Sequence, residues 1–265
     1  MHPKDIFVGI YSPGRRLVEF QVEIKNVADA LAKVSTIIAK FGINIYSGFI
    51  TAYPEKPEAL FSFIADTTQV SVTPEQLIEE LKGLDVVLGV NLYEPKLKGF
   101  ITDKLHFPLL ALGERSLTFR VESLAEMFRR LYEVFGSAAA FILYQMGSTL
   151  GSDKVEKLRM SYNLSDEEVL KMILDERIAK GWCIPELIEF DKANSRVVVR
   201  VYELFECLPS KEKENEAKSY FFKGYLEGVL KKVLNREVRV VEERCIAKGD
   251  AYCEFVAYTL KHDGD

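Results

Sequence analysis

An acidic residue and two cysteines lie close together near the C-terminus of the chain. Val238, Val240 and Glu242 alternate along a predicted strand and share one face, because successive strand side chains point to opposite sides. The two valines indicate that this face is buried, and a buried carboxylate is costly unless something pairs with it. Glu242, Cys245 and Cys253 therefore predict a metal or ligand site at one end of a hairpin.

The sequence leaves three interpretations of this group open. Structural zinc takes four ligands and favours cysteine sulfur, so the acid and the two thiols supply three of them. Alternatively, Cys245 and Cys253 are packed thiols beside a salt-bridged Glu242, or they form a disulfide, which a reducing compartment disfavours. Between them, Lys248-Gly249-Asp250 is typical of a hairpin tip, with Gly249 as the turn glycine.

Composition narrows the class of protein. The 265 residues are 48% hydrophobic with a formal net charge of −5, so we expect packed cores and no electrostatic attraction to nucleic acid or anionic membranes. The N-terminus is charged where a signal peptide would be apolar, and the most apolar stretch, 138–144, is too short to span a bilayer. We therefore expect a cytoplasmic location.

The first half predicts an α+β domain. Val18, Phe20, Val22 and Ile24 alternate with polar residues as in a half-buried strand, and a helical period follows. The order strand, helix, strand, strand, helix, strand is that of a ferredoxin-like βαββαβ fold. The expected elements are strands at 18–25, 44–53, 59–67 and 86–93 and helices at 27–41 and 73–83. A boundary at 95–99 gives domains 1–96 and 97–265.

The second half predicts a mixed α/β domain with an antiparallel sheet. Helices are expected at 123–135, 138–150, 165–181 and 219–234, the second of them buried, and strands at 182–191, 196–207 and around the cysteine hairpin. A charged loop, 209–218, precedes the last helix. Gly224 and Gly228 lie one helical turn apart, which favours close packing of this helix against a neighbour.

Residues 17–95 resemble the ACT domain family. The strand order and the segment from Asp29 to Ile45 carry the resemblance. It implies pairing into homodimers and an amino-acid ligand, with Asn26, Asp29 and Asn44 at the binding site. Asp29 stands where the family usually has a glycine, and its carboxylate would repel the carboxylate of such a ligand.

Residues 100–260 resemble the 4-vinyl-reductase domain family. The matching pieces are Tyr144-x-x-Gly147-x-x-x-Gly151, Gly224-Tyr-Leu-Glu-Gly228 and Glu242-x-x-Cys245-x-x-x-Gly249-Asp250-x-x-Cys253-x-Phe255. Relatives include the sensor domains of phenol- and xylene-responsive transcription activators, which bind small aromatics in an apolar cavity beside a structural zinc. More remote relatives are subunits of TRAPP vesicle-tethering complexes, which bind acyl chains.

The resemblance also implies which residues bind zinc. In the aromatic sensors the ligands are a glutamate, two cysteines at this spacing and a further cysteine at the start of the preceding helix. Glu242, Cys245 and Cys253 match, whereas the fourth position falls on Ser219 or Tyr220. Cys207 lies further upstream, across the charged loop, and is the remaining candidate.

Aromatic residues on the predicted helices of the second domain are candidates for a ligand cavity. Such residues are most often core, but ligand sites are concave and mostly apolar. The residues expected to line a cavity are Phe128, Tyr132, Phe141, Tyr144 and Tyr220.

The sequence contains few residues and motifs that are typical of enzymes. Of three histidines, two are near the ends and His106 stands alone, and no Gly-x-Ser-x-Gly or dinucleotide motif occurs. The leading hypothesis is a sensor that binds a small hydrophobic or aromatic ligand in the second domain. One alternative is a reductase-like enzyme or accessory factor in tetrapyrrole or cofactor metabolism, and another is a TRAPP-like scaffold. Because no output domain is visible, a sensor would act through a separate protein partner or by carrying its ligand.

Overall fold

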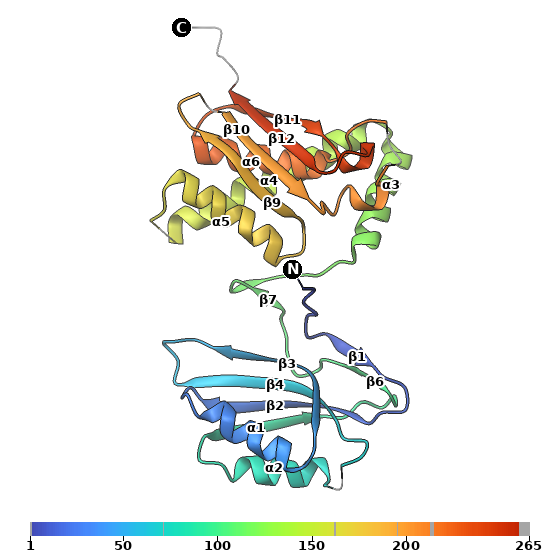
Figure 1. Cartoon of the computed structure of the whole chain (residues 1–265), viewed down its shortest axis with the longest axis vertical. Helices are drawn as coiled ribbons and strands as arrows, with labels where there is room; N and C mark the ends of the chain where they lie inside the picture. The colour runs from blue at the N-terminus through green and yellow to red at the C-terminus, as the bar shows by residue number, and fades with distance from the viewer. Residues whose placement is uncertain (1, 71, 162, 195, 213–214, 260–265) are drawn as a thin grey trace. The chain divides into compact units, whose positions relative to one another are not determined.

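A computed structural model describes residues 2–70, 72–161, 163–194, 196–212 and 215–259. The chain divides into two compact units, Met1–Leu117 and Thr118–Asp265. Each unit has its own sheet and its own hydrophobic core, and each is described separately below (Figure 1).

The N-terminal unit is built on a four-stranded antiparallel sheet with the strand order β3-β4-β2-β5. Helices α1 and α2 cover one face of this sheet (Figure 1). The sequence of strands and helices is the one predicted. The elements are β2 Leu17–Lys25, α1 Ala30–Lys40, β3 Asn44–Ala52, β4 Glu58–Asp66, α2 Pro74–Lys82 and β5 Val87–Tyr93.

Alternation along β2 separates the two faces of the sheet. Val18, Phe20, Val22 and Ile24 are buried in the core beneath the helices. Helix α2 begins at a capping box, in which the Thr73 side chain accepts from the Gln76 amide and the Gln76 side chain accepts from the Thr73 amide. Side chains at the odd positions of β2 point to the opposite face, where a second layer covers Leu17 and Glu19 and leaves Glu23 and Lys25 exposed.

That second layer was not predicted. Strand β1 (Gly9–Tyr11) pairs with β6 (Phe100–Thr102), and Leu17, Ile64 and Ile101 form a small core on this side. Residues 100–106 therefore belong with the first sheet. The compact unit consequently extends to Leu117, past the expected boundary at residue 96. A short hairpin, β7 (Leu110–Ala111) with β8 (Glu114–Arg115), follows.

The C-terminal unit combines an antiparallel sheet with four helices. Its strand order is β11-β12-β10-β9, with α6 lying against the sheet and α4 packed along α6 (Figure 1). The mixed α/β prediction is confirmed. The elements are α3 Val121–Phe135, α4 Ala138–Ser161, α5 Asp166–Ala179, β9 Ile184–Asp191, β10 Arg196–Tyr202, α6 Tyr220–Leu234, β11 Val238–Arg244 and β12 Cys253–Thr259, with 3-10 turns η1 Leu208–Ser210 and η2 Ile246–Lys248.

Two pairs of glycines let α4 and α6 cross in backbone contact. A Cβ on Gly147 would lie 2.0 Å from the carbonyl oxygen of Phe221, and one on Gly224 would lie 2.1 Å from that of Tyr144. One turn further, the corresponding distances are 2.2 Å for Gly151 and 2.1 Å for Gly228. No side chain fits at these distances, so the predicted close packing of the glycine-bearing helix is confirmed.

Helix α4 differs from the prediction in length and in burial. It runs to Ser161, and only the stripe that faces α6 is buried, including Ala139, Leu143 and Val155. Phe141 is 66% exposed because it points away from the crossing, although the sequence around it is apolar on all sides. Among the helices of the described residues, none is both long and apolar enough to cross a membrane.

Candidate functional site: a thiol and carboxylate centre beside a groove

Three sulfurs and a carboxylate meet at one end of the C-terminal sheet. The Sγ atom of Cys207 lies 3.6 Å from Sγ of Cys245 and 3.7 Å from Sγ of Cys253. One donor atom from each cysteine and one oxygen of Glu242 all lie within 4.8 Å of one another. The three cysteines are fully buried and Glu242 is half-buried. We refer to these four residues as the thiol centre.

Different elements supply the four side chains. Glu242 is on β11, and Cys253 begins β12. Cys207 follows β10, whose Val201 pairs directly with Cys253. The chain that leaves β10 therefore starts beside Cys253, and this adjacency brings Cys207 into the centre. Cys207 thus completes the set of four, whereas the position that the family resemblance indicated is occupied by Ser219.

The turn between Cys245 and Cys253 is held by its own backbone. The carbonyl of Cys245 accepts the amides of Lys248 (3.0 Å) and Asp250 (3.2 Å), and the Asp250 carboxylate accepts the Cys245 amide at 2.8 Å. Gly249 has φ +98°, as expected of a turn glycine. The Ile246 amide donates to Sγ of Cys253 at 3.3 Å, which stabilises negative charge on that sulfur.

The N-terminus of α6 adds polar contacts through Ser219 and Glu206. Ser219, the residue before the helix, lies with its Oγ 2.8 Å from Sγ of Cys207 and donates to Oε1 of Glu242 at 2.7 Å. Glu206 accepts the amides of Phe221 and Phe222, each at 2.9 Å, and so caps the first turn. These contacts fix the helix start against the centre.

Proximity shifts the acidity of the group. Hydrogen bonds from the thiols of Cys207 and Cys253 lower the pKa of Cys245. Burial, followed by the negative charge of Cys245, raises the pKa of Glu242 to about 8. Burial also raises the pKa of Glu206 to about 8, against the lowering effect of its two amide donors. All four cysteines are free thiols, so the disulfide alternative does not describe this structure.

The donor chemistry fits a tetrahedral metal ion. Two sulfurs bound to zinc at about 2.3 Å in tetrahedral geometry are about 3.8 Å apart. The two distances from Cys207 to its neighbouring sulfurs, 3.6 and 3.7 Å, are close to this value before any ion is added. Cys207, Cys245, Cys253 and Glu242 would supply all four ligands, and burial of the sulfurs would leave no open position for catalysis.

A groove of about 640 Å³ runs along the same end of the unit. Phe141 and Tyr144 come from α4, and Tyr220 comes from α6. Residues 216 and 217 before α6 and the residues of β11 as far as Glu242 complete the lining. Three of the predicted aromatic residues are therefore brought together. Glu242 belongs both to the groove and to the thiol centre, so the two are continuous.

Glu227 joins the groove to the helix crossing. It is the acidic residue of the Gly224-Tyr-Leu-Glu-Gly228 motif, and its Oε2 accepts the Val240 amide of the edge strand β11 at 3.0 Å. Lys231 pairs with its other oxygen at 3.1 Å. Burial and a hydrogen bond to Glu227 also raise the pKa of Tyr144. Glu227 was not among the predicted site residues, although its place between two close-packing glycines is a signal that it faces a neighbour.

Phe128 and Tyr132 do not line this groove. Phe128 stacks in a separate aromatic cluster with Phe205 and Phe221, at ring-centroid distances of 6.4 and 5.9 Å. Tyr132 lies under the ammonium of Lys218. Three of the five predicted cavity residues therefore line the groove and two do not, because α3 presents Phe128 and Tyr132 in another direction.

The remaining predicted ligand residues lie in the N-terminal unit. The Asn26 amide donates to the carbonyls of Tyr53 and Lys56, which closes the loop between β3 and β4, and Asp29 pairs with Lys33. Asn44 is exposed at the start of β3. None of the three lines either of the two described grooves.

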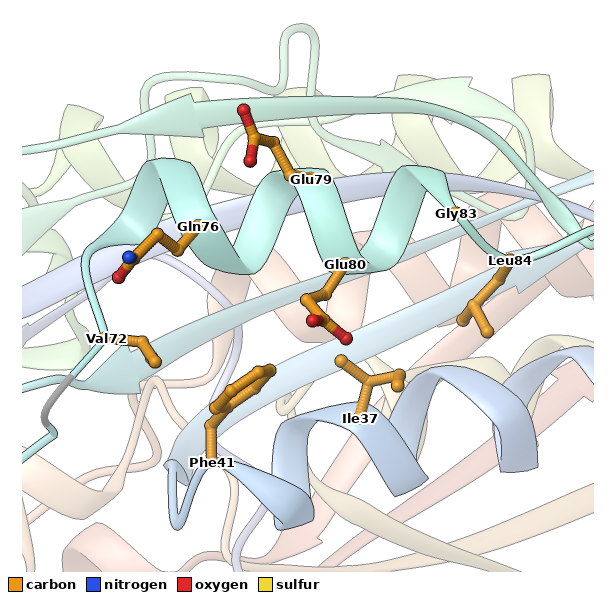
Figure 2. A pocket seen from close by; sticks show the side chains of 8 residues that line it. All are labelled: Ile37, Phe41, Val72, Gln76, Glu79, Glu80, Gly83 and Leu84. Carbon is orange, nitrogen blue, oxygen red and sulfur yellow. The ribbon is translucent and has the colours of Figure 1, made fainter.

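The groove of the N-terminal unit lies between α1 and α2. Figure 2 shows Ile37 of α1 and Phe41, the residue after this helix, facing Glu80 and Leu84 across it, with Glu79 pointing away. Lys40 pairs with Glu80 at 3.2 Å on the surface. The lining of this groove therefore combines apolar residues with Gln76, Glu79 and Glu80.

Comparison with known proteins places the thiol centre within a family match. The 4-vinyl-reductase domain family matches residues 197–259, a range that includes Cys207, Glu242, Cys245 and Cys253. An uncharacterized protein of Methanocaldococcus jannaschii is 26% identical over 176 residues, which cover 65% of this chain and 94% of that protein.

Solved structures match parts of this chain. The phenol-responsive sensory domain of the transcription activator PoxR, crystallised with phenol, is 17% identical and covers 58% of this chain and 82% of its own, with a TM-score of 0.51. A vinyl-4-reductase family protein of Methanocaldococcus jannaschii is 19% identical and covers 55% and 99%, with a TM-score of 0.33. The ACT domain of a Chlorobium tepidum GTP pyrophosphokinase is 16% identical and covers 30% and 99%, with a TM-score of 0.26.

Proposed function

We propose that the C-terminal unit is a sensor for a small hydrophobic or aromatic molecule, which binds in the groove along α4, α6 and β11. The observation that carries this proposal is that Phe141, Tyr144 and Tyr220 face a groove of about 640 Å³ that ends at Glu242. This volume lies in the range of small-molecule sites. The 4-vinyl-reductase domain match and the phenol-responsive fold neighbour support the same class of function.

The thiol centre would hold zinc as a structural ion in this proposal. Zinc would fix the start of α6, through the contact of Cys207 with Ser219, and the end of β11, through Glu242. These are two walls of the groove. A ligand that displaces the Glu242 carboxylate would alter one ligand of the ion. Occupancy of the groove would then be transmitted to the hairpin of β11 and β12, provided the two arrangements differ in ligand affinity.

The N-terminal unit would act as an ACT-like module in the same proposal. Its order of strands and helices and its sheet order, β3-β4-β2-β5, support this assignment. The module would pair chains into a homodimer and bind an amino acid. Native mass spectrometry of the full chain would show a dimer, and a monomer at micromolar concentration would contradict the pairing role.

The groove can be tested with phenol and p-cresol as probes. Because Phe141 is 66% exposed, Phe141→Ala removes an aromatic wall without opening the core. An aromatic pair contributes about 0.5–1.5 kcal/mol, so the dissociation constant measured by ligand-observed NMR would rise roughly 2- to 13-fold. Phe135→Ala is the matched control, since Phe135 is also an exposed helical phenylalanine and does not line the groove. Equal affinities for both variants and the wild type would contradict the groove as the binding site.

A further inference from the structure

A second group of ligand-type side chains lies in the N-terminal unit, on the sheet face that α1 and α2 leave uncovered. Glu19 comes from β2, while Asp103 and His106 come from the segment after β6. One donor atom from each of the three lies within 4.8 Å of the others. We refer to these residues as the Glu-Asp-His cluster. It lies outside the range of the 4-vinyl-reductase domain match.

The spacing of the donor atoms matches that of ligands around one ion. Nδ1 of His106 lies 2.9 Å from Oδ1 of Asp103 and 3.3 Å from Oε1 of Glu19. Two ligands that are each about 2.1 Å from a divalent ion are roughly 3.0 Å apart at right angles and roughly 3.4 Å apart at the tetrahedral angle. A single ion could therefore reach all three atoms with little movement.

One oxygen of the cluster, Oε1 of Glu19, also lacks a hydrogen-bond partner among the described residues, and a bound ion would be its partner. Glu19 is fully buried, and its Oε2 accepts the Lys104 amide at 3.0 Å. Its other oxygen, Oε1, has no hydrogen-bond donor within the described part of the chain and points at the imidazole. If Nδ1 of His106 carries a proton, it donates to Oδ1 of Asp103 at 2.9 Å. Within the described ranges, Oε1 of Glu19 is then left without a hydrogen-bond donor. A cation would satisfy all three atoms together.

Surrounding residues orient the imidazole for this role. Oγ of the buried Ser62 lies 2.8 Å from Nε2, the ring nitrogen that faces away from the carboxylates. Histidines that bind metals usually donate their second ring nitrogen in this way, which fixes the tautomer. Phe7 and Phe49 pack edge-on against the ring at centroid distances of 5.8 and 5.0 Å. The ring is held while Nδ1 remains directed at the two carboxylates.

An ion could reach the cluster from solvent. The side chains of Asp103 and His106 are each 16% exposed, whereas Glu19 is at the bottom. Burial raises the pKa of Glu19 to about 7, with the carboxylate of Asp103 contributing in the same direction. A bound cation would displace the proton that this acid holds near neutral pH, so metal affinity would increase with pH.

We propose that Glu19, Asp103 and His106 bind one divalent transition-metal ion in the N-terminal unit, separately from the thiol centre. Carboxylate and imidazole ligands suit Mn²⁺, Fe²⁺ and Zn²⁺, whereas thiolates select zinc among these. The proposal is independent of ligand binding in the groove. Either one can fail without the other.

Mn²⁺ uptake by the full-length protein tests the proposal. The protein is stripped of metal and given one equivalent of zinc, which the three thiolates bind in preference to the oxygen ligands. MnCl2 is then added, and free Mn²⁺ is measured by electron paramagnetic resonance. The expected result is one tightly bound Mn²⁺ per chain in the wild type and at least ~100-fold weaker binding in Glu19→Gln and Asp103→Asn. Asp85→Asn, which alters an exposed acid of the same unit, should bind Mn²⁺ as the wild type does.

A measurement on the wild type guards against misfolded variants. Bound Mn²⁺ broadens nearby NMR signals, so amides of residues 103–106 and of Glu19 should disappear first and together. The proposal is overturned if the wild type does not bind one Mn²⁺ per chain. The three side chains would then share a proton and bind no metal ion. It is also overturned if broadening is spread over exposed carboxylates while the signals around His106 persist.

Discussion

The thiol centre and the Glu-Asp-His cluster differ in how their donors are distributed along the chain. Three of the four residues of the thiol centre belong to one hairpin. Glu19 and His106, in contrast, lie near opposite ends of the amino-acid sequence of the N-terminal unit. The first group consists mainly of buried sulfur, and the second consists of oxygen and nitrogen with partial exposure. A local group is visible as a motif, while a distant one exists only after the chain has folded.

The surroundings of the two groups differ as well. Cys207 and Ser219 bring the end of β10 and the start of α6 into the thiol centre, so the ion would tie several elements together. The Glu-Asp-His cluster attaches one returning segment to a sheet that already has its own core on the other face. Loss of the first group should therefore affect folding much more than loss of the second.

Removal of the thiol centre should have the largest effect. Zinc present at 1,000 times its dissociation constant stabilises the folded state by about 4 kcal/mol, and Cys207→Ser should lose most of this. Cys183→Ser is the matched control, because Cys183 is buried but lies outside the centre. Zinc content by elemental analysis and urea unfolding measure the result. The same zinc content in both variants would mean that Cys207 is not a ligand.

A methyl group at the helix crossing should have the next largest effect. The Cβ of Gly224→Ala would lie 2.1 Å from the Tyr144 carbonyl, so we expect a loss of about 3 kcal/mol in unfolding free energy. In Gly89→Ala the nearest atom is a side-chain oxygen of Glu23 at 3.1 Å, which can move. Urea unfolding should separate the two. Similar losses would mean that the crossing has room to relax.

The stability of the N-terminal unit should fall with rising pH when the Glu-Asp-His cluster holds no metal, and should rise with pH when it does. In chelator, the folded-state pKa of Glu19, about 7, exceeds its unfolded value, so its contribution to stability is complete below about pH 4.5 and is lost as pH rises through 7. We expect amide exchange in β2 to report a loss of about 2 kcal/mol between pH 5 and 8. Glu19→Gln should remove this slope.

Added Mn²⁺ should make the stability of β2 in the wild type increase with pH. The reason is that metal binding is favoured as the ligands lose their protons. Exchange in β2 is the appropriate probe, since Glu206 and Glu242 have raised pKa values in the other unit and would contribute to global unfolding. A slope that is identical in Glu19→Gln and the wild type would assign the titration to other groups.

The smallest effect should come from the residue behind the imidazole. Ser62→Ala removes one neutral hydrogen bond to His106 and should cost about 1 kcal/mol in stability. The substitution should also weaken Mn²⁺ binding roughly 10-fold, because the Ser62 hydroxyl no longer orients the imidazole ring. Mn²⁺ titration and thermal unfolding test both expectations. Unchanged Mn²⁺ affinity would show that Phe7 and Phe49 orient the imidazole without help.

Local patterns predicted much of the fold. Alternation at Val18, Phe20 and Val22 identified β2, and Thr73 with Pro74 identified the start of α2. Spacing likewise identified Glu242, Cys245 and Cys253 as neighbours. These features depend on residues that are close in sequence, where strand and helix periods determine which side chains share a face.

Features that depend on tertiary neighbours were not predictable in the same way. Cys207 enters the thiol centre because β10 lies beside β12, and no spacing rule reveals that adjacency. His106 stood alone in the sequence because residues 100–106 return over the first sheet only in the folded chain. The aromatic residues of α3 and α4 were identified by type, but the direction in which each helix presents them follows from the crossing with α6.

That crossing determines how the C-terminal unit can move. Because Gly147 and Gly151 each meet a carbonyl of α6 and Gly224 and Gly228 each meet one of α4, a shift of either helix along its axis would bring a larger side chain against backbone. Translation is therefore blocked at four points, while a small swivel about the contact leaves all four intact. Any rearrangement of the groove walls should accordingly be a scissor motion with its pivot at these glycines.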